Sequence, residues 1–480
     1  MISRYRSVIG LDLGSRKLKA VEVKLTGKKP VITSLGLIDT PPDAINQTGI
    51  LNPLAVGDAI KRLFTTHEMN AREVIYSLAG QASVTIRMVQ VPGTEATAKD
   101  QEFLNSEIQR RNPFFEAQIS SDYFIFPPKK NSSQRDAVLA IAPQTSIQMI
   151  SDLISDTGKK LTSIDIEPLA FGRALITNYP PENRDKTVCI VEIGHTTTSI
   201  NIYSKGRLLM PRQVPVGGAM FTKAISESKG ISMIEAEKLK KEKLNFLEDA
   251  PQESEMNQFY SDLSDPNQLP EQSEEQPAPS SSLITELPAE TTEKPKEEEA
   301  SSDEFQPYNP FGSTDDSASG SMQDFYASLT SSQPEQKEPE TIEPEPQKTQ
   351  IFTELTLPTD EPAPITQFVQ PYNSPNQGSE PDSLASACQP ILEEFASEIE
   401  RSIEYIRSHD NEVDLIMLCG GGSQIKGLKE YFQKNLNINC DTYNPFNKIK
   451  LDLNEEEQKM VDEHSEEFTV AIGNALQVMY

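Results

Sequence analysis

One strand–turn–strand pattern occurs twice in this chain, at positions 180 residues apart. The first copy is Val8–Val23 (VIGLDLGSRKLKAVEV) and the second is Val188–Tyr203 (VCIVEIGHTTTSINIY). In each copy an apolar strand ends near an acid, Asp12 or Glu192, and a glycine follows two residues later, before a polar turn and a second strand. A repeat at this distance predicts two related halves that each open with a β-hairpin. The alternative is two unrelated hairpins that share a common plan, since tight turns often use Asp, Gly and Ser.

Apolar periodicity divides much of the remaining chain into helices and strands that alternate, the pattern of an α/β protein. Asn112–Pro113 should stop one helix, and Pro168 suits the first turn of another. The expected helices are Leu51–Phe64, Asp100–Arg111, Ser146–Thr157, Glu167–Asn178, Thr222–Ser228, Ser232–Lys243, Leu384–His409, Gln424–Asn435 and Glu466–Val478. The expected strands outside the hairpins are Val84–Val91, Ala137–Ala142, Leu161–Ile166 and Val413–Cys419.

The formal net charge of −29 is concentrated in residues 248–383. That segment holds 30 of the 73 acidic residues, 4 of the 44 basic residues and 19 of the 35 prolines. Its apolar surface is too small to offset an ordering cost of ~1–2 kcal/mol per residue, so we expect it to be disordered. The remaining chain is nearly neutral, which argues against a nucleic-acid partner, because such partners need a basic surface.

Composition also limits the chemistry and the location. The four cysteines have no C-x-x-C spacing and the four histidines are scattered, so we expect reduced thiols and no zinc site. Cys189 and Cys419 lie in apolar strand-like runs, where burial is expected. The sequence predicts neither a membrane span, which needs ~18 consecutive apolar residues, nor a signal peptide. A membrane would therefore be reached only through a partner.

The turns of the two hairpins have the chemistry of a phosphate clamp. A glycine directly after a strand lets a phosphate approach backbone amides, as Gly14–Ser15 would allow in the first hairpin. Asp12 could hold a hydrated Mg²⁺, which needs only one or two carboxylates, and Lys19 could reach the same phosphate. If the halves are related, the second turn faces the first, and His195 within it is either a phosphate ligand or an exposed turn residue.

A third glycine-rich turn, Gly420–Ser423, follows a buried-looking strand and precedes an expected helix. Backbone amides in such a turn can face an anion, and its glycines let a nucleoside lie flat on the chain. No Walker A loop and no dinucleotide-binding glycine fingerprint occurs. Three glycine-containing turns at strand ends together predict a nucleotide site of another kind.

Five motifs in this order resemble the nucleotide-site elements of the actin-like ATPase superfold. They are GLDLGS (Gly10–Ser15), IEPLAFGRAL (Ile166–Leu175), VEIGHTTT (Val191–Thr198), LCGGGS (Leu418–Ser423) and AIGNAL (Ala471–Leu476). Within that superfold the chain resembles the family of the type IV pilus assembly protein PilM, a relative of the cell-division protein FtsA. Further segments that resemble this family are Ser83–Pro92, Arg111–Phe114, Ser121–Phe126, Arg212–Ile225 and Glu235–Glu242.

This resemblance implies an actin-like α/β fold of two related halves around a nucleotide cleft, with a small extra subdomain. The first subdomain would be 1–82, the extra subdomain 83–160 and the remainder of the first half 161–187. The second half would be 188–247 and 384–480, interrupted by the long disordered acidic insertion 248–383.

The resemblance also implies roles for single residues around ATP and Mg²⁺. Asp12 and Glu192 would hold the metal, and Glu167 would lie near the attacking water and act with Glu192 in catalysis. On their own, Glu237 and Lys240 would be an exposed i, i+3 ion pair worth about 0.2–0.5 kcal/mol. The implied nucleotide-binding residues are Asp12, Gly14, Ser15, Lys19, Gly194, Thr196, Thr197, Thr198, Gly217, Gly218, Glu237, Lys240, Gly420, Gly421, Gly422 and Ser423.

One residue departs from the family pattern in a way that should affect the rate of ATP hydrolysis. The second phosphate loop usually begins with Asp, where this chain has Glu192. The extra methylene moves the carboxylate by roughly 1 Å, and misplacement on that scale can cost about 10²-fold in rate. We therefore expect ATP binding with slow or negligible turnover.

PilM-like proteins are cytoplasmic scaffolds, so the resemblance implies a protein at the inner face of the inner membrane. It would bind the cytoplasmic tail of a PilN-like membrane protein and link it to the pilus motor ATPases and platform protein. Arg87, Asn112, Phe114 and Phe115 are candidates for the tail-binding surface, although Arg87 could be merely solvated and the two phenylalanines ordinary core. Two alternatives are an FtsA-like polymerising membrane tether and an actin-fold small-molecule kinase or ATPase.

The acidic segment contains short repeats of its own. Tyr308–Phe311 (YNPF) repeats Tyr443–Phe446, and Gln306–Asn309 (QPYN) recurs at Gln370–Asn373. These repeats are either chance or docking motifs on a flexible arm.

Overall fold

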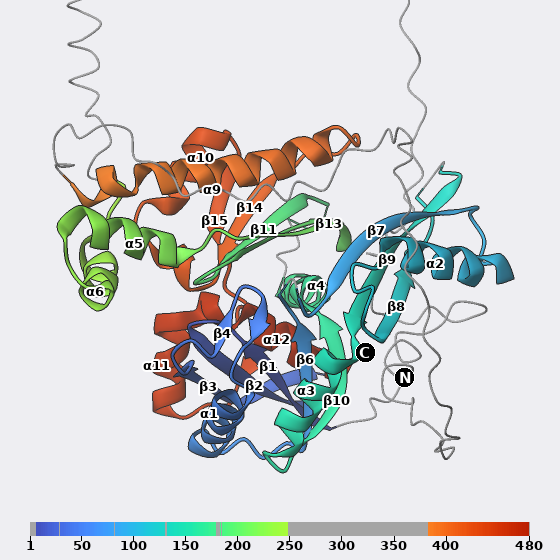
Figure 1. The fold of residues 1–480 in the computed structure, drawn as a ribbon, viewed down its shortest axis with the longest axis horizontal. Coiled ribbons are helices and arrows are strands. Elements are labelled where there is room, and N and C mark those ends of the chain that lie inside the picture. Colours follow the sequence, from blue (N-terminus) through green and yellow to red (C-terminus); the bar gives the residue numbers. More distant parts are fainter. Residues whose placement is uncertain are drawn as a thin grey trace, which may run out of the picture.

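The computed structural model describes residues 6–27, 29–80, 82–129, 132–178, 183, 185–247 and 383–479. These residues form two halves, each built on a β-sheet, and a smaller three-stranded sheet at one side (Figure 1). The acidic segment that we expect to be disordered lies, apart from Ser383, outside the described residues, as do the repeats within it. No helix in the described part of the chain is long and apolar enough to cross a membrane.

The first half contains a six-stranded sheet in the order β10-β6-β1-β2-β3-β16. Ile9 and Leu11 point from β1 into a core against the helices α1 and α3, while the alternate residue Val8 packs on the other face against α12. The elements are β1 (Ser7–Leu13), β2 (Lys17–Thr26), β3 (Lys29–Asp39), α1 (Pro53–Thr66), β6 (Glu73–Leu78), α3 (Gln144–Ser155), β10 (Lys160–Ile166), β16 (Lys450–Leu451) and α12 (Thr469–Ala475). A short hairpin, β4 (Ile45–Asn46) and β5 (Gly49–Ile50), stands beside this sheet.

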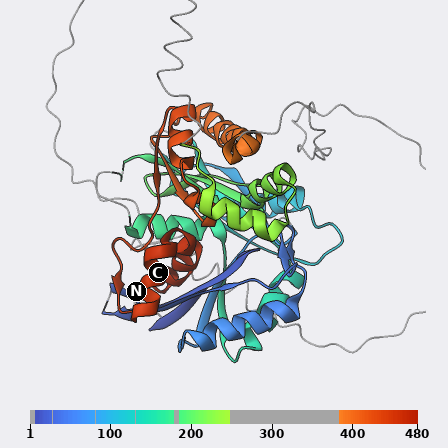
Figure 2. The same ribbon diagram turned by 90° about the vertical axis from the view of Figure 1, so that its left-hand side faces the viewer.

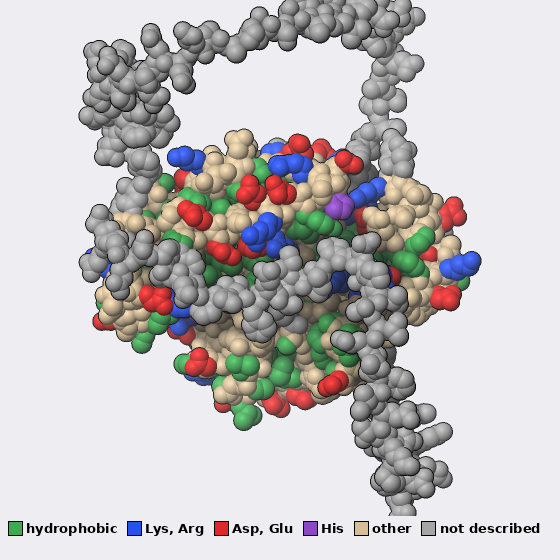
Figure 3. Space-filling view, turned by 45° about the horizontal axis from the view of Figure 1, so that its top comes forward, with side chains coloured by type: hydrophobic (Ala, Val, Ile, Leu, Met, Phe, Trp, Pro, Cys, Tyr) green, Lys and Arg blue, Asp and Glu red, His purple; other side chains and the backbone are tan. Residues whose placement is uncertain are grey.

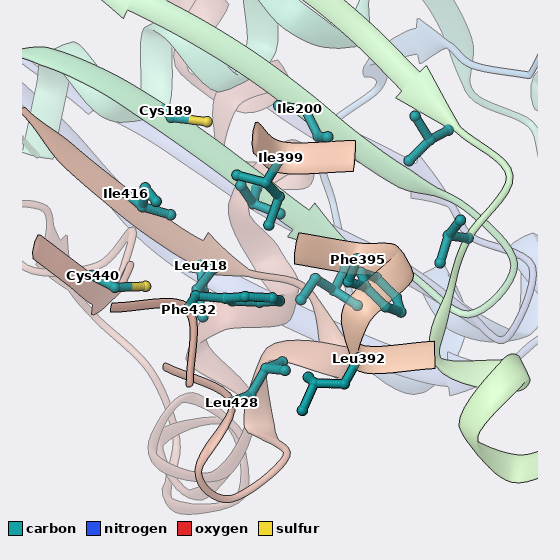
Figure 4. Packing of buried hydrophobic residues seen from close by; sticks show 14 of the residues in the cluster. Cys189, Ile200, Leu392, Phe395, Ile399, Ile416, Leu418, Leu428, Phe432 and Cys440 are labelled. Carbon is teal, nitrogen blue, oxygen red and sulfur yellow. The ribbon is translucent and has the colours of Figure 1, made fainter. Parts of the chain in front are cut away.

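The second half contains a five-stranded sheet in the order β13-β12-β11-β14-β15. Cys189, Ile200 and Leu418 lie on its face toward α9, where they pack with Phe395 and Phe432 (Figure 4). All four cysteines are buried free thiols, which confirms the expected burial of Cys189 and Cys419. The elements are β11 (Thr187–Ile193), β12 (Thr198–Ser204), β13 (Arg207–Val214), α5 (Gly218–Lys229), α6 (Met233–Lys243), α9 (Leu384–Arg407), β14 (Leu415–Cys419), α10 (Leu428–Leu436) and β15 (Asn439–Thr442).

The two halves repeat one topology, as the sequence predicts. In each, three antiparallel strands are followed by a strand that pairs in parallel with the first, which is β6 beside β1 and β14 beside β11. The turns match in detail, because Gly14 N donates to Lys17 O at 3.1 Å and Gly194 N donates to Thr197 O at 3.0 Å. A Cβ on either glycine would lie 2.8 Å from that carbonyl oxygen, so both turns require glycine.

Two buried helices, α4 (Glu167–Asn178) and α12, lie between the two halves and pack across each other (Figure 2). They touch at Gly473, where an added Cβ would lie 2.0 Å from the carbonyl oxygen of Ala170. Fully buried Arg173 reinforces the crossing, since its Nε donates to Gly473 O at 2.7 Å and its guanidinium pairs with Asp165. The two helices therefore join the halves through direct backbone packing.

The expected helix Glu466–Val478 is divided into three pieces in the structure. They are the 3₁₀ turn η3 (Ser465–Phe468), the helix α12 and the 3₁₀ turn η4 (Leu476–Met479). Turns of this kind often tighten the chain at the ends of an α-helix, so only the middle of the expected range is regular helix.

The small unit consists of β7 (Thr85–Pro92), β8 (Ile119–Ile125) and β9 (Gln134–Pro143), in the order β7-β9-β8, with α2 (Ala98–Arg111) on one face. Its expected end at residue 160 is too late, because Ile150 and Leu153 of α3 pack into the core of the first half. We place its end near Pro143.

Other expected boundaries also need correction. The helix expected at Gln424–Asn435 begins only at Leu428, because Gly421–Gln424 forms a 3₁₀ turn, η2, and Gly427 (φ 83°) precedes the helix. The sequence does not predict the strands β3, β6, β8 and β13 or the helix α11 (Glu455–His464). On the face in Figure 3, acidic and basic side chains are interspersed, as expected for a nearly neutral body.

Candidate functional site

A cleft of about 370 Å³ lies where the turns of the two hairpins meet. Ser15 Oγ and Thr196 Oγ1 share a hydrogen bond of 3.1 Å, although they are 181 residues apart in the chain. The structure therefore brings the two predicted turns face to face. The predicted residues that line the cleft are Asp12, Gly14, Ser15, Lys19, Glu167, Glu192, Gly194, Thr196, Thr197, Gly218, Glu237, Lys240, Gly421 and Gly422.

Four predicted residues do not line the cleft but support its walls. Thr198 Oγ1 donates to Val216 O at 2.7 Å, and Ser423 Oγ donates to Gly420 O at 2.7 Å. Gly217 packs so closely that an added Cβ would lie 2.5 Å from His195 O. Gly420 (φ 79°) adopts a backbone conformation that favours glycine.

Partly buried carboxylates gather at the floor of the cleft around Lys19. Lys19 Nζ lies 2.5 Å from Asp12 Oδ2, and although burial opposes its charge, Asp12 and Glu192 raise the pKa of Lys19. Burial, with Asp12 next in importance, raises the pKa of Glu192 to about 7. Burial and the nearby Glu192 raise the pKa of Glu167 well above its usual range, and Ser199 Oγ donates to Glu167 Oε2 at 3.1 Å.

The donor set at this floor suits a hydrated Mg²⁺, since that ion prefers oxygen ligands and keeps several of its waters. Asp12 and Glu192 are the two carboxylates that would hold it. Among the described residues, no group of three or more His, Cys, Asp or Glu side chains is arranged to hold a metal ion directly.

Glu237 and Lys240 are not an exposed ion pair. Lys240 Nζ lies 2.7 Å from Glu237 Oε2 and donates to Gly218 O at 3.0 Å and to Thr222 Oγ1 at 2.9 Å. Burial opposes the charge on Glu237, but the hydrogen bond from Lys240 lowers its pKa to about 2. The pair therefore ties α6 to the N-terminal end of α5 at the cleft wall.

A second wall of the cleft contains residues that the sequence does not predict as part of the site. Glu467 Oε1 accepts from Lys17 Nζ at 3.1 Å and lies 3.0 Å from His464 Nδ1, beside Gly421. Despite burial, the hydrogen bond from His464 and the charge of Lys17 lower the pKa of Glu467 to about 2. Arg16 and Lys241 also line the cleft. Lys17 and Glu467 are 450 residues apart, and no local spacing connects them.

The candidate partner residues lie on the small unit and do not line the cleft. Phe114 is half-buried against the core of that unit, which fits the core alternative, whereas Phe115 is 86% exposed and does not. Arg87 is exposed, and Asn112 Oδ1 accepts from Phe114 N at 2.9 Å.

Known proteins resemble this chain over different parts of its length. Residues 10–256 match the family model described as type IV pilus assembly protein PilM, and residues 189–473 match that of cell division protein FtsA. FtsA of Neisseria meningitidis serogroup B is 27% identical over 260 residues, which cover 49% of this chain and 61% of that protein. FtsA of Bacillus subtilis is 23% identical over 258 residues, which cover 49% and 57%. The chain thus spans about 60% of the length of these relatives.

A solved structure described as a PilM-PilN type IV pilus biogenesis complex has the same fold. It is 18% identical, and the match covers 99% of each chain with a TM-score of 0.61. Two halves with matched hairpins, joined by two buried helices around a cleft, define a protein of the actin-like class. The PilM model matches half of the chain, and the chain belongs to the PilM family of type IV pilus assembly proteins.

Proposed function

We propose that this protein is a cytoplasmic ATP-binding scaffold of a type IV pilus machine. It binds the cytoplasmic tail of a PilN-like inner-membrane protein and links it to the motor ATPases and platform protein. Family membership supports the pilus role, and the solved complex of the same fold supports a PilN-like partner. The observation that carries nucleotide binding is the contact of the two glycine turns across the cleft.

In this proposal the cleft holds ATP with Mg²⁺. Backbone amides near Gly14 and Gly194 receive the phosphates, Lys19 neutralises them, and Asp12 and Glu192 hold the hydrated metal. The nucleoside lies between α6 and the turn at Gly421. Mg²⁺ would neutralise charge on the phosphates. Ser199 donates a hydrogen bond to Glu167, the residue that would lie near the attacking water.

Turnover should be slow, because Glu192 stands where the family pattern has the shorter Asp. A steady-state assay with Mg²⁺ and ATP is expected to give less than about 1 s⁻¹, the low end of the usual enzyme range. Faster turnover would contradict this part of the proposal.

The tail-binding surface is placed on the small unit. Its strand β8 lies at one end of the strand order β7-β9-β8 and pairs with β9, so an extended peptide would add along the outer edge of β8. Exposed Phe115 lies in the loop just before this strand. Strand addition beside an apolar side chain is a recurring way of binding peptide tails.

Titration of a labelled synthetic tail against the purified protein tests this surface. Phe115→Ser is expected to weaken tail binding by about tenfold, while Tyr405→Ser, at another exposed aromatic residue, should leave it unchanged. Equal affinity in both variants would remove the surface from the proposal. If the wild-type protein fails to bind the tail both with and without ATP, the result contradicts the proposed PilN-like partner.

An FtsA-like polymerising tether is the second candidate, because residues 189–473 match the FtsA model. Sedimentation with ATP would show filaments if this candidate were correct.

A further inference from the structure

Basic side chains from both halves gather at the mouth of the cleft. Arg16 directly follows Ser15 and His195 directly precedes Thr196, so the hydrogen bond between Ser15 and Thr196 brings Arg16 and His195 to the same place. His195 O also accepts from Ala219 N at 2.8 Å, which fixes this turn against α5.

The helix α6 adds two lysines beside them. Lys240 reaches the N-terminal end of α5 through Gly218 O, and Lys241 follows it at the cleft wall. Glu237 forms ion pairs with both lysines, at 2.7 Å from Lys240 and 3.6 Å from Lys241. Arg16 has no ion-pair partner among the described residues.

These charges act on one another. Burial, and after it the charges of Lys240, Arg16 and Lys241, lower the pKa of His195, while Glu237 opposes them. The mouth therefore has more positive charge than its own carboxylate balances, and an anion would relieve the repulsion.

We propose that Arg16, His195 and Lys241 form a second anion subsite, which takes a phosphate group on the ribose of the bound nucleotide. This inference rests on the proposed nucleotide function. The 5′ phosphates lie at the glycine turns and toward Lys19, which is 8% exposed at the floor. The ribose then lies between those turns and α6, next to His195 and Lys241.

A phosphate suits this group of side chains better than a smaller anion. The Arg16 guanidinium can donate two parallel hydrogen bonds to phosphate oxygens, and Lys241 supplies a mobile point charge. Because Arg16 belongs to one half and the other two residues to the second, such a ligand would also join the halves.

Calorimetric titration with AMP and with adenosine 3′,5′-bisphosphate tests the subsite, since the two ligands differ by one phosphate. The bisphosphate is expected to bind at least about tenfold more tightly to the wild-type protein. Arg16→Gln and Lys241→Gln should reduce this ratio below threefold. Lys238→Gln is the matched control, because Lys238 is an exposed residue of the same helix that does not line the cleft.

ATP titration of the wild-type protein separates the two proposals. If the wild-type protein binds ATP but binds the bisphosphate less than threefold more tightly than AMP, the subsite alone is overturned. The same holds if Arg16→Gln and Lys241→Gln leave this ratio of affinities unchanged. Absence of ATP binding would overturn the proposed function as well.

Discussion

Three lysines of the cleft each neutralise a largely buried carboxylate. Lys19 pairs with Asp12, Lys240 with Glu237 and Lys17 with Glu467. The first two pairs involve residues whose motifs can be recognised in the sequence. The third cannot be predicted, because its members are brought together only when the C-terminal segment returns to the first hairpin.

Glu467 should contribute to stability in a pH-dependent way. Its pKa in the folded protein, about 2, lies below the usual 4.5, so the contribution is present above pH 4.5 and is lost as the pH falls toward 2. Glu467→Gln is expected to lower the free energy of unfolding by about 1–3 kcal/mol at pH 7 and by less at pH 3.

Urea denaturation at the two pH values measures this difference. Glu463→Gln is the control, because Glu463 is 56% exposed and its surface ion pair should contribute about 0–1 kcal/mol. An equal effect of Glu467→Gln at both pH values would contradict the expected role of this carboxylate.

At the scale of elements, the sequence predicts the hairpins and the strongly periodic helices and misses others for physical reasons. The helix α11 contains only Met460 and Val461 as apolar residues, too few to form a repeat along one face. The short apolar run of β6 is ambiguous between helix and strand without its neighbours. The sequence also predicts a helix directly after the turn at Gly421, but in the structure the helix begins only at Leu428, after Gly427.

The crossing of α4 and α12 makes a direct prediction. Gly473→Ala should lower the free energy of unfolding by at least about 2 kcal/mol, because its Cβ would overlap the backbone of Ala170. Gly57→Ala, in the middle of α1, should change it by no more than about 1 kcal/mol, since its Cβ meets only the end of the Leu153 side chain at 3.2 Å. Thermal or urea denaturation compares the two. Similar stabilities would show that the crossing is not tightly packed.

At the scale of the whole molecule, the repeated hairpin predicts two related halves around a cleft, and the structure confirms this arrangement. The end of the small unit is harder to predict, because α3 continues the chain from β9 but packs on the first half. Such packing depends on tertiary contacts that local spacing does not encode.

The acidic segment should be dispensable for folding. Replacing residues 250–380 by a flexible linker of about 20 residues is expected to raise the free energy of unfolding by at most about 2 kcal/mol, since loop closure costs ~0.6 kcal/mol per doubling of length. Tail affinity should be unchanged if the repeated YNPF and QPYN motifs are chance. A loss of tail binding would instead assign a docking role to this segment.

The two glycine turns form the nucleotide site in the proposed function, and calorimetric titration with Mg²⁺ and ATP tests this most directly. The wild-type protein should bind one ATP, Lys19→Met should bind at least about tenfold more weakly, and Lys238→Gln should bind as the wild type does. Circular dichroism would establish that each variant is folded. No ATP binding by the folded wild-type protein, or equal binding by folded Lys19→Met, would contradict the proposed site.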